Sequence, residues 1–145
     1  VYQPGRVTAY GYKNGKRILT EKIENTKPAA KIVMKTDRQM ITADGRDVSV
    51  VTIELHDQNG RLVPDACNTL KVTLEGNGRI IGAGNGDPQY MGEDHPKDKD
   101  CRASSIPAFN GLAQVLIQSS REPSALRLTA NGDGLKTGVI VITTK

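Results

Sequence analysis

The stretch VSVVTIELH, residues 48–56, is the segment that decides the fold. Two sets of residues alternate along it, the first formed by Val48, Val50, Thr52 and Glu54 and the second by Ser49, Val51, Ile53 and Leu55. Successive side chains of a β-strand point to opposite faces of the sheet, so the two sets lie on different faces. The second set is the more apolar, and we predict that it faces a core.

Further short strands are expected on both sides of this stretch, with turn residues between them. The expected strands cover residues 30–36, 39–42, 70–75, 80–81, 112–117, 125–130 and 135–143. Successive short strands separated by Gly, Asn, Asp and Pro are typical of a Greek-key sandwich. The predicted fold is therefore an all-β, immunoglobulin-like Greek-key β-sandwich, and its domain is expected to span residues 28–145.

The composition agrees with this fold and excludes several kinds of partner. The chain has 145 residues, of which 37% are hydrophobic, with one Phe, four Tyr and no Trp. A core must then come from Val, Ile, Leu and Ala, and the β-branched residues among them favour strands. The net charge is +4, but Lys and Arg are interspersed with Asp and Glu, so no nucleic-acid partner is expected. No run is apolar enough for membrane insertion, and no cofactor or metal is expected.

The first 27 residues are expected to form a β-hairpin and a linker. Residues 6–12 alternate, residues 13–16 read KNGK, and residues 17–24 return as a second strand. An Asn-Gly pair suits the two-residue connection of a twisted hairpin. A lone hairpin is only marginally stable in water, so it must pack on another part of the protein. The chain begins at Val1 without a leader sequence, as expected for a piece of a longer protein.

A glycine-rich stretch, GNGRIIGAGNGDP at residues 76–88, predicts a short buried strand that runs into a loop. Gly82, Gly84 and Gly86 recur at every second position, so we expect another segment to approach the backbone closely there. Gly86 is expected to have a positive φ within the turn that ends at Pro88. Residues 89 to about 105 show no apolar periodicity and are expected to form a long loop.

Few residues qualify as candidate site residues. For a sugar or an interdomain contact the candidates are Asn85, Asp87, Tyr90 and His95, with Tyr90 as the only aromatic of the long loop. A tyrosine can equally bury its ring and leave its hydroxyl in water. Cys67 and Cys101 could form a disulfide or remain free thiols. Most Asp residues sit at turns, where they hydrogen-bond the local backbone, so no catalytic carboxylate pair is expected.

Four short motifs carry a resemblance to a known family: ADGRD at 43–47, DQNGRLVP at 57–64, GNGDP at 84–88 and FNGLA at 109–113. In their order and spacing the chain resembles, over residues 28–145, the C-terminal immunoglobulin-like domain of bacterial glycoside hydrolase family 2 enzymes, the β-galactosidase-like ones of Bacteroidetes. Residues 1–27 are similar to the last strands of the preceding domain in those enzymes.

The resemblance implies a non-catalytic accessory module with a role in assembly. The two catalytic glutamates of the family belong to a (β/α)8 barrel that has no counterpart in this sequence, so no catalytic residue is carried over. The implied partners are the other domains of the same polypeptide and, through the parent enzyme, a galactoside or other glycan. The implied location is the periplasm, the cell surface or the exterior. Two alternatives stay open: a spacer domain of an invasin- or intimin-type adhesin, and a free-standing carbohydrate-binding module.

Overall fold

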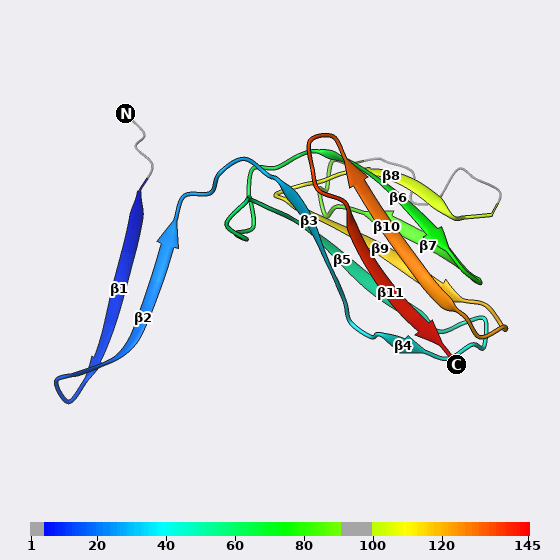
Figure 1. Cartoon of the computed structure of the whole chain (residues 1–145), viewed down its shortest axis with the longest axis horizontal. Helices are drawn as coiled ribbons and strands as arrows, with labels where there is room; N and C mark the ends of the chain where they lie inside the picture. The colour runs from blue at the N-terminus through cyan, green and yellow to red at the C-terminus, as the bar shows by residue number, and fades with distance from the viewer. Residues whose placement is uncertain (1–4, 91–99) are drawn as a thin grey trace.

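The computed structural model describes residues 5–90 and 100–145, and within these ranges the regular elements are all strands (Figure 1). The strands are β1 (Arg6–Lys13), β2 (Lys16–Glu24), β3 (Lys31–Thr36), β4 (Met40–Ile41), β5 (Val48–His56), β6 (Thr69–Glu75), β7 (Gly78–Gly84), β8 (Ala103–Pro107), β9 (Leu112–Ser119), β10 (Ala125–Gly132) and β11 (Gly138–Thr144). Strands β3 to β11 form two sheets, of order β4-β11-β10-β6-β8 and β3-β5-β9-β7. The all-β sandwich predicted from the sequence is confirmed.

The core lies between the two sheets and is aliphatic. Ser49, Val51, Ile53 and Leu55 of β5 are all fully buried, which confirms the predicted inward face of this strand. Strand β6 buries Leu70, Val72 and Leu74 from the opposite sheet in the same alternating pattern. The core is completed from β7, β8, β9, β10 and β11, mainly by Ile80, Ile106, Val115, Ile117, Leu126, Leu128 and Ile142.

The chain changes sheets between the two strands that were expected at residues 30–36 and 39–42. Strand β3 pairs with β5 in antiparallel fashion, whereas β4 pairs in parallel with β11, where Met40 lies opposite Thr143. The two expected segments therefore belong to different layers. This crossing closes one edge of the sandwich.

Strand β8 is a correction, because the long loop predicted for residues 89 to about 105 includes residues 103–105 of this strand. The strand pairs with β6, with Ala103 opposite Thr73 and Pro107 opposite Thr69. Ile106 is the strand's buried hydrophobic residue, and Pro107 ends it. Such a short edge strand has too little alternation to be recognised, and proline is tolerated at a sheet edge.

The glycine-rich stretch forms β7 as predicted, but its close contacts lie elsewhere. Gly86 has a φ of 81°, which confirms the predicted positive φ. No described atom lies within 4 Å of a Cβ placed on Gly84 or Gly86, so the expected close approach is wrong at these two positions. The shortest such distances are at Gly76 and Gly111, where a Cβ would lie 2.3 Å from the carbonyl oxygen of Ala125 and 2.2 Å from that of Val63.

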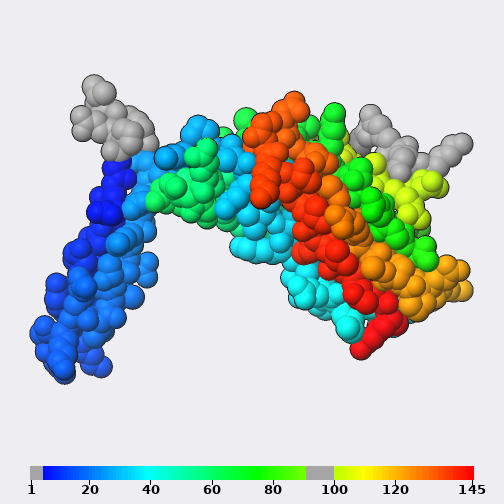
Figure 2. All heavy atoms as spheres, viewed as in Figure 1, coloured from blue at the N-terminus to red at the C-terminus, as the bar shows by residue number. Residues whose placement is uncertain are grey.

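Strands β1 and β2 form a separate two-stranded sheet that extends away from the sandwich (Figure 2). Asn14 and Gly15 connect them with φ values of 51° and 74°, as expected for an Asn-Gly hairpin turn. The register places Val7 opposite Ile23, and these side chains are 71% and 76% exposed. The hairpin thus has no core of its own. None of the described residues belongs to a helix of the kind that could span a membrane.

Candidate functional site

The candidate residues of the 85–90 loop bond mainly to the loop's own backbone. Asn85 donates from Nδ2 to the carbonyl of Pro107 at 2.9 Å and accepts the amide of Asp87 at 3.0 Å. Asp87 in turn accepts the amide of Gln89 through Oδ1 at 2.9 Å. Tyr90 is half-buried, and His95 lies outside the described residues. The structure therefore gives Asn85 and Asp87 a role in shaping the loop.

Cys67 and Cys101 are both free thiols, which corrects the candidate disulfide. Cys67 precedes β6 and Cys101 precedes β8, and these two strands run antiparallel. The cysteines therefore lie near opposite ends of the strand pair, separated by several residues at about 3.4 Å per residue. A disulfide requires the two Cα atoms to lie within about 7 Å.

The turn carboxylates accept hydrogen bonds from the backbone, as the sequence predicted. Asp44 Oδ1 accepts the amides of Arg46 and Asp47, each at 2.8 Å. The amide of Asp47 is the main cause that lowers the pKa of Asp44. Asp47 Oδ2 accepts the amide of Thr42 at 2.8 Å, and this bond is the main cause of its own lowered pKa. These hydrogen bonds favour the ionised form of both carboxylates and hold the turn in place. A general acid must instead carry a proton that it can donate.

One acid–histidine pair lies on the outer face of β5. Glu54 Oε2 lies 2.7 Å from His56 Nε2, while the ammonium of Lys35 contacts Glu54 Oε1 at 2.7 Å. Lys35 is the main cause that lowers the pKa of Glu54. His56 Nδ1 is also occupied, 2.9 Å from the carbonyl of Gly60. The three side chains satisfy one another, so this cluster does not offer a free base.

A buried carboxylate joins the sandwich to the linker. Asp57 is 0% exposed, and its Oδ1 accepts the amides of Asn59 at 2.8 Å and Arg61 at 2.9 Å. Its Oδ2 accepts the amide of Lys27 in the linker at 3.1 Å. The hydrogen bond from Arg61 is the main cause that lowers the pKa of Asp57. A single side chain therefore shapes its own turn and holds the chain that leads to the hairpin.

Arg61 extends this connection to the hairpin itself. Its guanidinium forms an ion pair and a hydrogen bond with Glu24, the last residue of β2, and donates to the carbonyl of Asn25 at 3.3 Å. Glu24 also faces Arg6 of β1 at 3.6 Å. We call Asp57, Arg61, Glu24 and Lys27 the joint. It connects residues 30 or more positions apart in the sequence.

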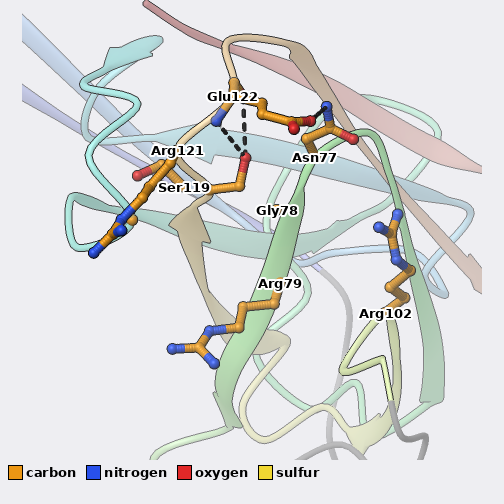
Figure 3. Close-up of a pocket in the computed structure, with 9 residues that line it drawn as sticks. Asn77, Gly78, Arg79, Arg102, Ser119, Arg121 and Glu122 are labelled. Atoms are coloured by element: carbon orange, nitrogen blue, oxygen red, sulfur yellow. Dashed lines mark hydrogen bonds between the residues drawn. The ribbon is translucent and has the colours of Figure 1, made fainter.

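A basic depression lies at one end of the sandwich (Figure 3). Its volume is about 490 Å³, and its lining comes from the β4–β5, β6–β7 and β9–β10 turns, from the ends of β7 and β9, and from the segment before β8. The lining residues are Gly45, Asn77, Gly78, Arg79, Arg102, Ser119, Ser120, Arg121 and Glu122. We call this site the basic depression. Three arginines and one glutamate give it a positive charge.

Neither the joint nor the basic depression follows from the sequence pattern. The DQNGR segment carries only turn residues, and its bonds to the linker and the hairpin are long-range. The arginines of the depression lie at positions 79, 102 and 121, which share no spacing rule. Only the pairing of strands brings these turns together. No sequence signal short of the full topology would have identified either site.

Comparison with known proteins agrees with the fold and the motifs. The family model for glycoside hydrolase family 2 C-terminal domain 5 matches residues 32–141. Beta-galactosidase BoGH2A of Bacteroides ovatus is 36% identical over 141 residues, which is 97% of this chain but 16% of that protein. The match to the family model covers most of the sandwich.

Solved structures of related enzymes also contain this fold over nearly the whole chain. A family 2 glycosyl hydrolase from Bacteroides cellulosilyticus superposes with a TM-score of 0.83 and 27% identity, covering 98% of this chain and 19% of that one. A beta-glycosidase from Bacteroides vulgatus gives a TM-score of 0.82 and 27% identity, covering 98% and 18%. The chain therefore spans less than a fifth of the length of these relatives. It belongs to the glycoside hydrolase family 2 C-terminal domain family.

Proposed function

We propose that this chain is a non-catalytic accessory module of a secreted, β-galactosidase-like glycoside hydrolase, and that its role is in assembly. Membership in the family supports the hydrolase as the parent protein. The module corresponds to a small part of each relative, which supports a parent protein with further domains. We place the catalytic barrel among those domains. We propose those domains as its principal partners.

The observation that carries the assembly role is an exposed apolar hairpin fixed to a closed sandwich. One face of the hairpin presents Val7, Ala9, Leu19 and Ile23, none of which the sandwich covers. The joint holds this hairpin to the sandwich through Asp57 and Arg61. We propose that residues 1–27 form the end of the preceding domain and its linker, and that residues 28–145 form the module. In this arrangement the joint sets the angle between the two.

The chemistry of the described residues supports a catalytic site elsewhere in the parent protein. A glycosidase needs two carboxylates about 5 to 10 Å apart, free to act as acid and base or nucleophile. Asp44, Asp47 and Asp57 instead accept two or more hydrogen bonds from the backbone. Glu54 is held by Lys35 and His56. Each of these carboxylates is committed to the fold.

The parent enzyme is proposed to act on a galactoside or another glycan in the periplasm, at the cell surface or outside the cell. The module is proposed to stabilise that enzyme and to wall part of its substrate cleft, without binding nucleic acid or inserting into a membrane. Family membership favours this role over an adhesin spacer or a free-standing carbohydrate-binding module. Sequencing the gene around this segment should reveal an upstream barrel with two glutamates at strand ends. Tandem copies of residues 28–145 would instead indicate an adhesin.

An activity assay on the 145-residue chain tests the non-catalytic role directly. We expect no turnover of an aryl galactoside at any pH between 4 and 8. The matched control is the same preparation of a variant that carries Glu54→Gln, which separates contaminating activity from the chain's own. Turnover that copurifies with the chain and disappears in the variant would contradict the proposal.

A further inference from the structure

We propose that the basic depression is a binding site for the carboxylate of an acidic saccharide, such as a uronic acid residue. The choice of a saccharide rests on the proposed role in a glycan-degrading enzyme, whereas the choice of a carboxylate rests on the site itself. The site lies at one end of the sandwich, and the joint lies near Lys27 and Glu24 of the linker and hairpin. The two sites are built from different turns.

Two arginines of the depression offer their guanidinium groups to a ligand. Arg79 donates from Nε to Oε1 of Gln118 at 2.7 Å, which orients the group and leaves its terminal nitrogens without a partner among the described residues. Arg121 forms no hydrogen bond or ion pair with any described residue. Both side chains extend to the same side of β7 in Figure 3. A planar guanidinium matches a carboxylate better than any other charged side chain does.

The acid that lines the depression is already engaged. Glu122 accepts a hydrogen bond from Nδ2 of Asn77 at 3.2 Å, and its amide bonds to Oγ of Ser120 at 3.0 Å (Figure 3). No salt bridge joins Glu122 to an arginine within residues 5–90 and 100–145. Glu122 therefore forms an ion pair with neither Arg79 nor Arg121.

The turns around the depression are fixed to one another by backbone hydrogen bonds. The amide of Gly45 donates to the carbonyl of Ser120 at 3.2 Å, and the amide of Ser120 donates to that of Asn77 at 3.2 Å. Gly45 has a φ of 76°, and a Cβ there would lie 3.3 Å from Cγ of Arg121. The glycine lets the stem of Arg121 lie against the turn. The site is thus held in place before any ligand arrives.

Ser119 belongs to the floor of the depression and not to its open side. This residue is 4% exposed, and it lies on the same inward face of β9 as Val115 and Ile117. Its Oγ is enclosed and has no hydrogen-bond partner among the described residues. The groups that face a ligand are therefore those of Arg79 and Arg121.

The size and lining of the depression indicate the rest of the ligand. A volume of about 490 Å³ is larger than a carboxylate needs and lies within the range of small-molecule sites. Its lining consists of glycines and of amide, hydroxyl and charged side chains, with no large apolar side chain among them. Such a lining matches the hydroxyl groups of a pyranose ring. Recognition is therefore expected to depend on charge and hydrogen bonds and not on ring stacking.

A titration of the 145-residue chain tests the proposal by two-dimensional amide NMR. The probes are D-glucuronate and D-galacturonate, with D-galactose and acetate as matched partial ligands. We expect saturable shifts centred on Asn77, Arg79, Ser119 and Arg121 with a uronate, and binding about tenfold weaker with galactose or acetate. In Arg79→Gln and Arg121→Gln, uronate binding should weaken by about tenfold each. Arg127→Gln, an exposed arginine of β10 outside the depression, should bind as the unaltered chain does.

Each other outcome overturns the proposal. Absence of localised shifts with either uronate means that the depression binds no acidic sugar. Equal binding of acetate would mean that the depression recognises a carboxylate alone, as on an acidic side chain of another domain. Equal binding of galactose would mean that the carboxylate contributes nothing to binding. Thermal melts of each variant confirm that lost binding is not lost folding. The titration measures binding and not hydrolysis. Absence of uronate binding would therefore leave the proposed accessory role of the module unchanged.

Discussion

The hairpin and the sandwich are both well-paired β-structure, yet only one of them has a core. Strand β2 has nine residues, as does β5, and both lie in antiparallel ladders. Every residue of β2 before Glu24 is exposed, whereas buried and half-buried residues alternate along β5. Hydrogen-bonded pairing therefore does not distinguish the two regions. What distinguishes them is a second layer that covers the apolar face.

The comparison also shows how the two regions are coupled. The sandwich would close without the hairpin, because its buried cluster draws on residues 32–142. The hairpin contacts it through the joint, where Asp57 and Arg61 reach Lys27 and Glu24. Polar groups fix the geometry of the connection, while apolar burial supplies the stability of the sandwich. Substitutions and a truncation can test this difference between the hairpin and the sandwich.

The largest effect should come from the same substitution made in each region. Ile53→Ala in β5 removes a side chain that is 0% exposed and is expected to lower the free energy of unfolding by about 2–5 kcal/mol. Ile23→Ala in β2 removes one that is 76% exposed and should change it by less than about 0.5 kcal/mol. Urea unfolding of the two variants measures both values. Equal losses would mean that the hairpin is covered in solution, for example by a second copy of the chain.

The next effect should come from two glycines with a positive φ, of which only the first is packed against backbone. Gly76 has a φ of 100°, and an added Cβ would lie 2.3 Å from the carbonyl oxygen of Ala125. Gly76→Ala should therefore cost about 2–3 kcal/mol of stability, through backbone strain and displacement of β10. Gly86→Val should cost more than about 1 kcal/mol, from its positive φ alone, since its Cβ meets open space.

Gly84→Ala is the control for these two variants, because Gly84 has open space and no positive φ. Its unfolding free energy should stay within about 0.5 kcal/mol of the unaltered chain. A thermal melt of Gly86→Val that matches the unaltered chain would refute the conformational argument for this glycine. A tolerated Gly76→Ala would mean that β10 yields more easily than its packing indicates.

The sequence predicted the layers of the fold well because alternation is a local signal. The inward face of β5 and the hairpin turn at Asn14 and Gly15 followed from residue types within a few positions of each other. Strand β8 was missed because Ile106 is its single large apolar side chain, so its sequence shows no apolar–polar alternation. The close approach of Ala125 to Gly76 was missed because it depends on pairing between segments about 50 residues apart.

The candidate sites were harder to predict than the fold. Asn85 and Asp87 were selected for their polarity in a glycine-rich loop, but the polar groups of such a loop satisfy its own backbone. The roles of Arg61 and Arg121 depend on which turns meet at each end of the sandwich. Residue type alone carries no such information. The arrangement of turns is decided by sheet topology, which pattern analysis gives only as a class.

A third, smaller effect should reveal the joint by its pH dependence. Asp57→Asn keeps the shape of the side chain but removes the charge that the amides of Arg61, Asn59 and Lys27 stabilise. Because the pKa of Asp57 is lowered in the folded state, its contribution is present above the unfolded pKa of about 3.9. That contribution is lost as the pH falls through the lower, folded pKa.

The melting temperature of Asp57→Asn should therefore lie several degrees below that of the unaltered chain at pH 7, and the gap should narrow below about pH 4. Thermal melts followed by circular dichroism at pH 7, 5, 4 and 3 measure the gap. Asp133→Asn, in an exposed turn, is the matched control and should show no gap at any pH. A gap that stays constant down to pH 3 would assign the effect to lost packing and not to charge.

The smallest effect should come from removing the hairpin altogether. A chain of residues 28–145 keeps every member of the buried cluster and loses the amide of Lys27 and the ion pair from Glu24 to Arg61. It should unfold in a single cooperative transition, with a melting temperature lower by only a few degrees. Its urea m-value should hardly change, since m follows the surface exposed on unfolding and the hairpin buries little. A truncated chain without a cooperative transition would show that the hairpin is part of the folding unit, because only then would the exposed strands contribute to stability.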